Sequence, residues 1–253
     1  MSVKLYDLNM QKIQLRGVKW LEFTTEPPTV NRITDSVWNG DIALGRRRNS
    51  RRIQARFYYE SNDSVDYKTL RDEFFELLDP LNEMYAVDQD VPLKRWKVEI
   101  ESYNSLRINP TIAEVSIVFC CLRPFAESIV TTLNSNVGAY TKNSTTFSIQ
   151  NLGSVDIEPT ESELIIKITS ISATSSNLKV TNKTTGDLWS YQGVFKAGDV
   201  ITLDGVKYKR NGLNIIGLTN LGLINIAKGT NEFLIEGLTG QFEITFDFRY
   251  LYL

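Results

Sequence analysis

The chain of 253 residues contains no histidine and only two cysteines, the adjacent pair Cys120 and Cys121. Neighbouring residues of a strand point to opposite faces, so we expect both to be packing residues and expect no disulfide framework. Without histidine, the commonest general base and the middle member of a Ser-His-Asp or Cys-His arrangement are missing. The usual Cys/His zinc site cannot form either. We therefore expect no catalytic residue, no bound metal and no enzyme activity.

Long apolar segments are also missing. No run reaches the length of about eighteen apolar residues that suggests a membrane span, and charged residues recur throughout residues 1–30. We therefore expect no membrane partner and no secretory signal, and we expect synthesis in the cytoplasm. Neither GxxxxGK[ST] nor a strand-linked GxGxxG occurs, so no nucleotide cofactor is expected. The length is sufficient for two globular domains.

One amphipathic helix is predicted in the segment VDYKTLRDEFFELLDPL. Asp66 is expected to cap its start and Pro80 to close its end. Residues 52–60 and 114–121 alternate between apolar and polar, which predicts strands. A sheet with the helix packed against it is the economical arrangement, so residues 1–126 are predicted to form an α+β domain. The predicted apolar stripe of the helix consists of Tyr67, Leu70, Phe74, Leu77 and Leu81.

The composition changes after this domain. Residues 127–142 are rich in small polar side chains, which is typical of a linker or an exposed connection. Residues 143–253 show no convincing helix but many short strands, with two-residue hairpin turns expected at Asp204-Gly205 and Asn211-Gly212. Residues 242–250 alternate without exception, as a strand with one buried face does. This mainly β pattern predicts a sandwich or a barrel.

A run of arginines, RRRNSRRIQAR, is the most unusual feature of the sequence. Such a run can neutralise nucleic-acid phosphates. However, residues 1–127 hold 18 basic and 19 acidic residues, so no excess positive field remains to attract DNA. Arginine is also well suited to bidentate pairing with carboxylates across an interface. We favour an oligomer-interface or lumen-lining role, over a solvated face and over specific nucleic-acid binding, for Arg46, Arg47, Arg48, Arg51 and Arg52.

Two aromatic residues are candidates for a sugar platform. Trp189 and Tyr191 lie two positions apart in DLWSYQG and share one face of a predicted strand. If that face is exposed, the two rings can bind a pyranose ring, as in a carbohydrate-binding module. If it is the inside of a sandwich, both are core residues. Core packing is the interpretation that we favour.

Taken in order, several segments carry a resemblance to a known family. The second half resembles the C-terminal domain of siphophage distal tail proteins through TNKTTGDLWSYQG, AGDVITLDG, RNGLNIIGLTN, KGTNEFLIEG and the closing EITFDFRYLYL. The first half is similar to the N-terminal belt domain of that family through YKTLRDEFFELLDP, VPLKRWKVEIES and the strand that ends in FCCLRPFAES. The resemblance covers nearly the whole chain and rests on the order of these segments.

The resemblance implies both a fold and a role. The fold is a belt domain with a sheet, one helix and an extended hairpin, with residues 38–56 in or near that hairpin. A galectin-like β-sandwich over residues 143–253 follows it. The role is that of a non-enzymatic structural protein of a bacteriophage virion, located at the tail tip or baseplate of a siphovirus and made in the cytoplasm of the host bacterium.

The family also implies partners. Copies are expected to form a hexameric ring, or two such rings back to back, that joins the tail tube protein to the tail-associated tip protein. Baseplate or receptor-binding proteins for host adsorption are expected at its periphery. Galectin-like domains of this family generally lack a working sugar site. A free carbohydrate-binding module that uses the sandwich remains the alternative function.

Overall fold

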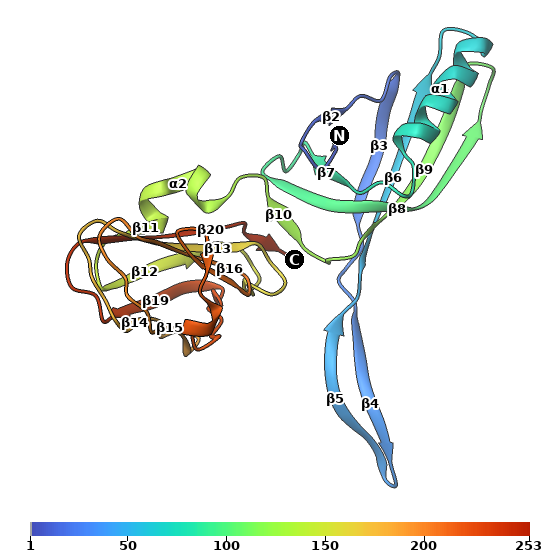
Figure 1. Cartoon of the computed structure of the whole chain (residues 1–253). Helices are drawn as coiled ribbons and strands as arrows, with labels where there is room; N and C mark the ends of the chain where they lie inside the picture. The colour runs from blue at the N-terminus through green and yellow to red at the C-terminus, as the bar shows by residue number, and fades with distance from the viewer. Residues whose placement is uncertain (1) are drawn as a thin grey trace. The chain divides into compact units, whose positions relative to one another are not determined.

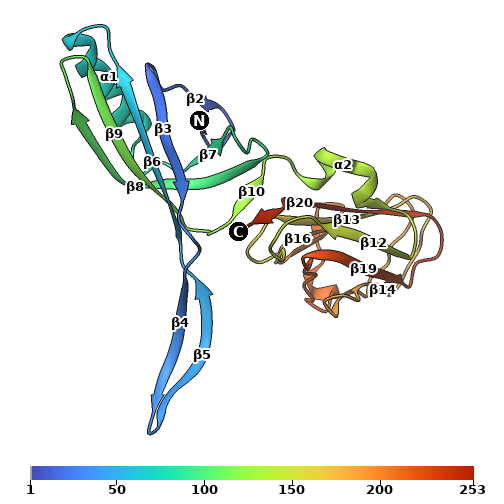
Figure 2. The ribbon, with the colours of Figure 1, turned by 180° about the vertical axis from the view of Figure 1, so that it is seen from behind.

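The computed structural model describes residues 2–253 and separates them into two compact units (Figures 1 and 2). The division falls between Glu127 and Ser128, and only the last residue, Leu253, is assigned across it. Each unit has its own sheets and its own buried residues.

The first unit is built around one curved antiparallel sheet with the strand order β2-β1-β7-β8-β9-β6-β3. The long strand β8 pairs with β7 through its first half and with β9 through its second half. The hairpin β4–β5 forms a separate two-stranded ribbon. The elements are β1 (Val3–Tyr6), β2 (Lys12–Ile13), β3 (Val18–Thr25), β4 (Val30–Val37), β5 (Gly40–Arg48), β6 (Arg51–Glu60), α1 (Ser64–Leu77), β7 (Met84–Asp88), β8 (Lys94–Arg107) and β9 (Ile112–Cys121), and β10 (Ala126–Ser128) lies at the division between the units.

Helix α1 covers one face of this sheet. The inward residues of β6 are buried and the residues between them are exposed or half-buried, as the period-two pattern predicts. Phe74 of α1 meets Phe57 and Tyr59 of β6, with ring centroids 6.0 and 4.8 Å apart. Edge-to-face contacts of this kind add to the burial of apolar area. The predicted α+β arrangement of sheet and helix is confirmed.

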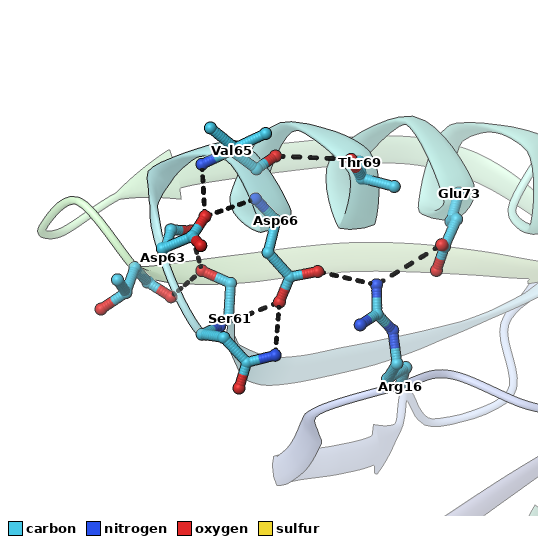
Figure 3. Close-up of polar contacts among 9 residues, drawn as sticks. Arg16, Ser61, Asp63, Val65, Asp66, Thr69 and Glu73 are labelled. Carbon is cyan, nitrogen blue, oxygen red and sulfur yellow. Dashed lines mark hydrogen bonds and ion pairs between the residues drawn. The ribbon is translucent and has the colours of Figure 1, made fainter.

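The first turn of α1 differs in detail from the sequence prediction (Figure 3). Asp63, and not Asp66, is the N-cap, because its carboxylate accepts hydrogen bonds from the backbone N–H groups of Val65 and Asp66. The Asp66 carboxylate instead accepts hydrogen bonds from Asn62 and from Arg16. These bonds, the backbone one first, hold the pKa of Asp66 below its ordinary value. Arg16 thus ties the segment before β3 to the helix.

The second unit is a β-sandwich with one additional helix. One sheet has the order β11-β20-β13-β16-β17-β18 and the other β12-β19-β14-β15. Its elements are α2 (Thr132–Tyr140), β11 (Thr141–Lys142), β12 (Thr146–Asn151), β13 (Leu164–Ser170), β14 (Leu178–Asn182), β15 (Asp187–Tyr191), β16 (Val200–Asp204), β17 (Lys207–Arg210), β18 (Leu213–Asn214), the 3₁₀ turn η1 (Ile216–Leu218), β19 (Gly229–Glu236), β20 (Phe242–Phe248) and β21 (Leu251–Tyr252).

The segment expected to be an exposed linker is ordered structure of the sandwich. Residues 127–142 contain α2 and β11, and β11 pairs with β20. Thr132 and Tyr140 are buried, and the hydroxyl of Thr132 donates to the backbone carbonyl of Phe246. The sequence suggested a linker because these residues are small and polar. In this segment a small polar side chain is buried because it forms hydrogen bonds to strand backbone. Hydrophobic periodicity does not reveal such contacts.

The two sheets of the sandwich pack face to face. Phe233 of β19 and Phe246 of β20 come from opposite sheets, and their ring centroids are 4.8 Å apart. The unbroken alternation predicted for residues 242–250 appears as buried residues on β20. Among the hairpins, Asn211-Gly212 forms the predicted two-residue turn, with positive φ at both residues. The turn predicted at Asp204-Gly205 lies one residue later, because Asp204 pairs with Lys207.

Candidate assembly interface

The hairpin β4–β5, residues 30–48, is the feature of the first unit that stands apart from its core, and we call it the arm. It runs on from β3 and β6 beyond the sheet (Figure 1), and all but one of its strand residues are exposed. Val37 pairs with Gly40 across the two-residue loop Trp38-Asn39. Gly40 has a φ of 122°, a conformation that suits glycine. At the base, Asn49 donates from its backbone and its side chain to Thr29.

The outer half of the arm is apolar. Trp38 at the loop is 99% exposed. Exposed apolar side chains of the two strands accompany it: Ile33, Val37, Ile42 and Leu44. Leu44 lies in a bulge, since Ile33 pairs with Gly45 and Thr34 with Ala43. Several exposed apolar side chains on a projecting ribbon are typical of a protein–protein contact.

The inner half of the arm is basic. It carries Arg32 on β4 and the run Arg46, Arg47 and Arg48 on β5, whereas the two aspartates of the arm lie nearer the loop. Arg48 lies over the ring of Phe125, 5.4 Å from its centroid. Arg32, Arg46 and Arg47 form no ion pair with any carboxylate in residues 2–253. Their charges are therefore available to another molecule.

Arg51 and Arg52, which the sequence grouped with these residues, are engaged within the chain. Arg51 is buried, donates to the backbone carbonyl of Glu26 at 2.6 Å and lies over the ring of Trp96. Arg52 forms a bidentate pair with Glu101, at 2.7 and 2.5 Å. The pair lowers the pKa of Glu101. Both arginines thus have structural partners within the first unit.

The hypothesis that Trp189 and Tyr191 form a sugar platform is wrong, because both side chains are buried. Trp189 and Tyr191 of β15 have no exposed surface and stack on each other, 6.4 Å between centroids. Trp189 also meets Tyr208 of the opposite sheet. The hydroxyl of Tyr191 accepts a hydrogen bond from Arg210 at 3.0 Å. This strand face is the sandwich interior, so these two rings cannot hold a sugar.

Sequence reasoning missed part of the arm. Its expected range, residues 38–56, leaves out β4 and the basic residue Arg32. The signal was present in VWNGD, where Asn39-Gly40 is a turn dipeptide that follows a β-branched stretch. Such a motif predicts a hairpin with Trp38 at its loop. Within the described residues, no helix could span a membrane and no three His, Cys, Asp or Glu side chains gather as metal ligands.

The first unit matches a known protein family. Residues 10–121, which contain the arm and most of the first sheet, match the family described as the phage tail protein RIFT-related domain. The first unit belongs to this phage tail family. The first unit thus carries a phage tail domain, and the arm lies within the matched residues. No curated protein sequence matches the chain.

The fold of one solved structure resembles both units of this chain. The crystal structure of SPP1 Dit (gp 19.1), described as a paradigm of the hub adsorption apparatus in phages that infect Gram-positive bacteria, matches with a TM-score of 0.75 at 10% identity. The match covers 99% of this chain and 100% of that one. A chain of the phage p2 baseplate in its activated conformation with Sr matches with a TM-score of 0.43 at 9% identity, over 98% of this chain and 97% of that one. The SPP1 match confirms the expected fold, a belt domain followed by a galectin-like sandwich.

Proposed function

We propose that this phage tail protein is the distal tail protein of a siphophage and that it assembles into a hexameric ring at the tail tip. It acts there as a structural hub without catalytic activity. The arm is the observation that carries this proposal. It exposes an apolar outer half and three unneutralised arginines that the rest of the described chain does not cover.

A ring accounts for both properties of the arm. A cyclic contact joins two different faces of the same chain, so an arm on one copy docks on another surface of the next. The apolar outer half supplies the area to bury. The arginines at the base supply charge pairs that fix the register. In this proposal Arg46, Arg47 and Arg48 are interface residues, and Arg51 and Arg52 hold the root of the arm in place.

The ring has further partners in this proposal. The SPP1 protein of the same fold is described as a hub of an adsorption apparatus. For this chain we infer the same position, with the tail tube protein on one side and the tail-associated tip protein on the other. Baseplate or receptor-binding proteins attach at the periphery, where the sandwich offers a rigid platform.

The mass of the purified protein in solution tests the ring. We expect size exclusion with light scattering to give a discrete species near six times 28.8 kDa, or its double. Its dissociation should increase with salt, because charge pairs at an interface are screened. A protein that stays monomeric at every concentration and salt, and that also fails to join the tail tube protein when the two are mixed, would contradict the proposal.

A further inference from the structure

Trp38 needs a receiving surface. Its side chain is almost fully exposed at the loop of the arm. Burial of an indole side chain removes a large apolar area from water and is therefore favourable. Its indole N–H is a donor only, so a receiving site must offer both apolar walls and an acceptor. A tryptophan anchored in a pocket is the typical energetic centre of a protein interface.

A cavity in the first unit has this chemistry. It has a volume of about 210 Å³, and its walls are mainly apolar. Val98 of β8, Cys120 of β9 and Leu122 line it, and Leu122 is itself exposed. Glu83 and Glu99 contribute carboxylates, and Lys97 and Arg123 contribute basic side chains. The side chain of Glu83 is paired with Lys97 at 2.9 Å, whereas the carboxylate of Glu99 makes no ion pair or hydrogen bond within the described part of the chain.

The arm cannot reach the cavity of its own copy. Cys120 pairs with Arg52 at the start of β6, so the cavity lies at the root of the arm. From Arg48 to Trp38 the arm spans ten residues, roughly 30 Å at the rise of about 3.3 Å per strand residue. Bending the loop back to the root would break the β4–β5 ladder. Loop and cavity therefore match only between two copies displaced by about one arm length.

We propose that Trp38 of one copy inserts into the cavity lined by Val98, Cys120 and Leu122 of the next copy, with Glu99 as the acceptor for its indole N–H. This inference rests on the proposed ring and names its contact. Because the protruding side chain and the cavity lie at different places on one chain, the contact between copies is head-to-tail. Such a contact closes into a ring when the rotation from one copy to the next divides a full turn. The free carboxylate and the apolar walls are the complement that Trp38 lacks within its own chain.

Cys120 makes the contact directly testable. We expect Trp38→Cys to form a disulfide with Cys120 of the neighbouring copy when the assembled protein is oxidised with diamide. A disulfide requires Cα atoms within about 7 Å, so it can form only if the loop docks beside Cys120. Non-reducing electrophoresis should then show a ladder of covalent oligomers. Cys121 is a poor competitor, because it is buried and burial raises the pKa of its thiol to about 12.

Matched variants decide the outcome. Trp38→Cys combined with Cys120→Ser should give no ladder, and neither should Leu44→Cys, an exposed cysteine elsewhere on the same arm. The alkylation rate of Cys120 provides an independent measurement in proteins that retain this cysteine. We expect Cys120 to react at least tenfold more slowly in the assembled wild-type protein than in assembled Trp38→Phe or Trp38→Ala. Of the two variants, Trp38→Ala should react faster.

The results also separate this contact from the ring itself. Assembled Trp38→Cys that gives no ladder, with Cys120 equally reactive in wild type and Trp38→Ala, overturns the docking site and leaves the ring standing. The same holds if a ladder forms when a third substitution, Leu81→Cys, is added to Trp38→Cys with Cys120→Ser. Leu81 is exposed in the segment after α1, so the contact would then lie there. A wild-type protein that never assembles, alone or on the tail tube, overturns the ring.

Discussion

Arg32 and Arg46 lie directly opposite each other on the two strands of the arm. Like charges at opposed positions of a strand pair repel, and neither guanidinium has a carboxylate partner in residues 2–253. The isolated chain gains nothing from this arrangement. We propose that acidic groups of a neighbouring copy offset this repulsion, and for this reason we assign the base of the arm to assembly.

Reversing one of these charges should therefore affect the monomer and the assembly in opposite directions. Arg46→Glu creates an opposite-charge pair with Arg32 and should stabilise the monomer slightly, by roughly 0.2–1 kcal/mol. Combined with Arg47→Glu, it should weaken assembly about tenfold or more, because attraction across the interface becomes repulsion. Urea unfolding of dilute protein measures the first effect and sedimentation across concentration the second.

The matched control is a double charge reversal on the sandwich. Lys207 and Lys209 are exposed on β17, and Lys207→Glu with Lys209→Glu changes the net charge by the same amount as the arm variant. We expect this control to assemble as the wild type does. If both variants lose assembly equally, net charge and not the arm is responsible.

The tryptophans of the arm and the sandwich should respond differently to truncation. Trp189→Ala leaves a cavity in the sandwich core and should cost about 3–5 kcal/mol of unfolding free energy. Trp38→Ala removes an exposed ring and should leave the stability of the dilute monomer unchanged while it weakens assembly. Urea unfolding followed by circular dichroism measures the first effect. Equal losses of monomer stability would show that Trp38 packs within its own chain.

Much of the fold could be predicted from the sequence, because burial imposes a period. The alternation on β6 and β20 follows the expected faces, and Tyr67, Leu70 and Phe74 of the predicted stripe are buried on α1. The predicted stripe extends too far, since Leu81 lies beyond the end of the helix and is exposed. The cap of α1 was placed three residues late, since two aspartates precede the apolar stripe and only the structure shows which one accepts the backbone N–H groups. Helix α2 was missed because its contacts are hydrogen bonds to strand backbone, as at Thr132.

The candidate site could be predicted only in part. The arginine run marked the base of the arm, but composition cannot tell Arg46, which has no acidic partner in the described chain, from Arg52, which pairs with Glu101. That distinction depends on which strand pairs with which. In the same way, the period-two pattern places Trp189 and Tyr191 on one face without saying whether that face is covered. Sheet pairing, and not local sequence, decides both questions.

The cap of α1 gives a test of the first unit alone. Asp63→Ala removes the acceptor of the N–H groups of Val65 and Asp66, and should cost about 1 kcal/mol of unfolding free energy. Asp63→Asn should retain most of the stability, since asparagine is also a good cap. Asp72→Ala, an exposed change within the same helix, is the control and should have little effect. A larger loss for Asp72→Ala than for Asp63→Ala would contradict the assignment of the cap.

The Arg52–Glu101 pair predicts a pH dependence with a definite sign. Arg52 holds the pKa of Glu101 below its ordinary value in the folded state, so the unfolded chain binds the proton more readily. The pair therefore contributes its full stability above the unfolded pKa, and this contribution is lost as the pH falls through the lower, folded pKa. Both side chains are partly exposed, so the contribution is small.

Glu101→Gln removes the titrating group and should isolate this contribution. We expect the variant to be slightly less stable than the wild type at pH 7, with a difference that shrinks in acid below the ordinary range of a glutamate. Because Arg52 already has its partner inside the chain, assembly of Glu101→Gln at pH 7 should match that of the wild type. A difference that grows in acid would reverse the sign of the linkage. A loss of assembly without a loss of monomer stability would instead return Arg52 to the interface, where the sequence first placed it.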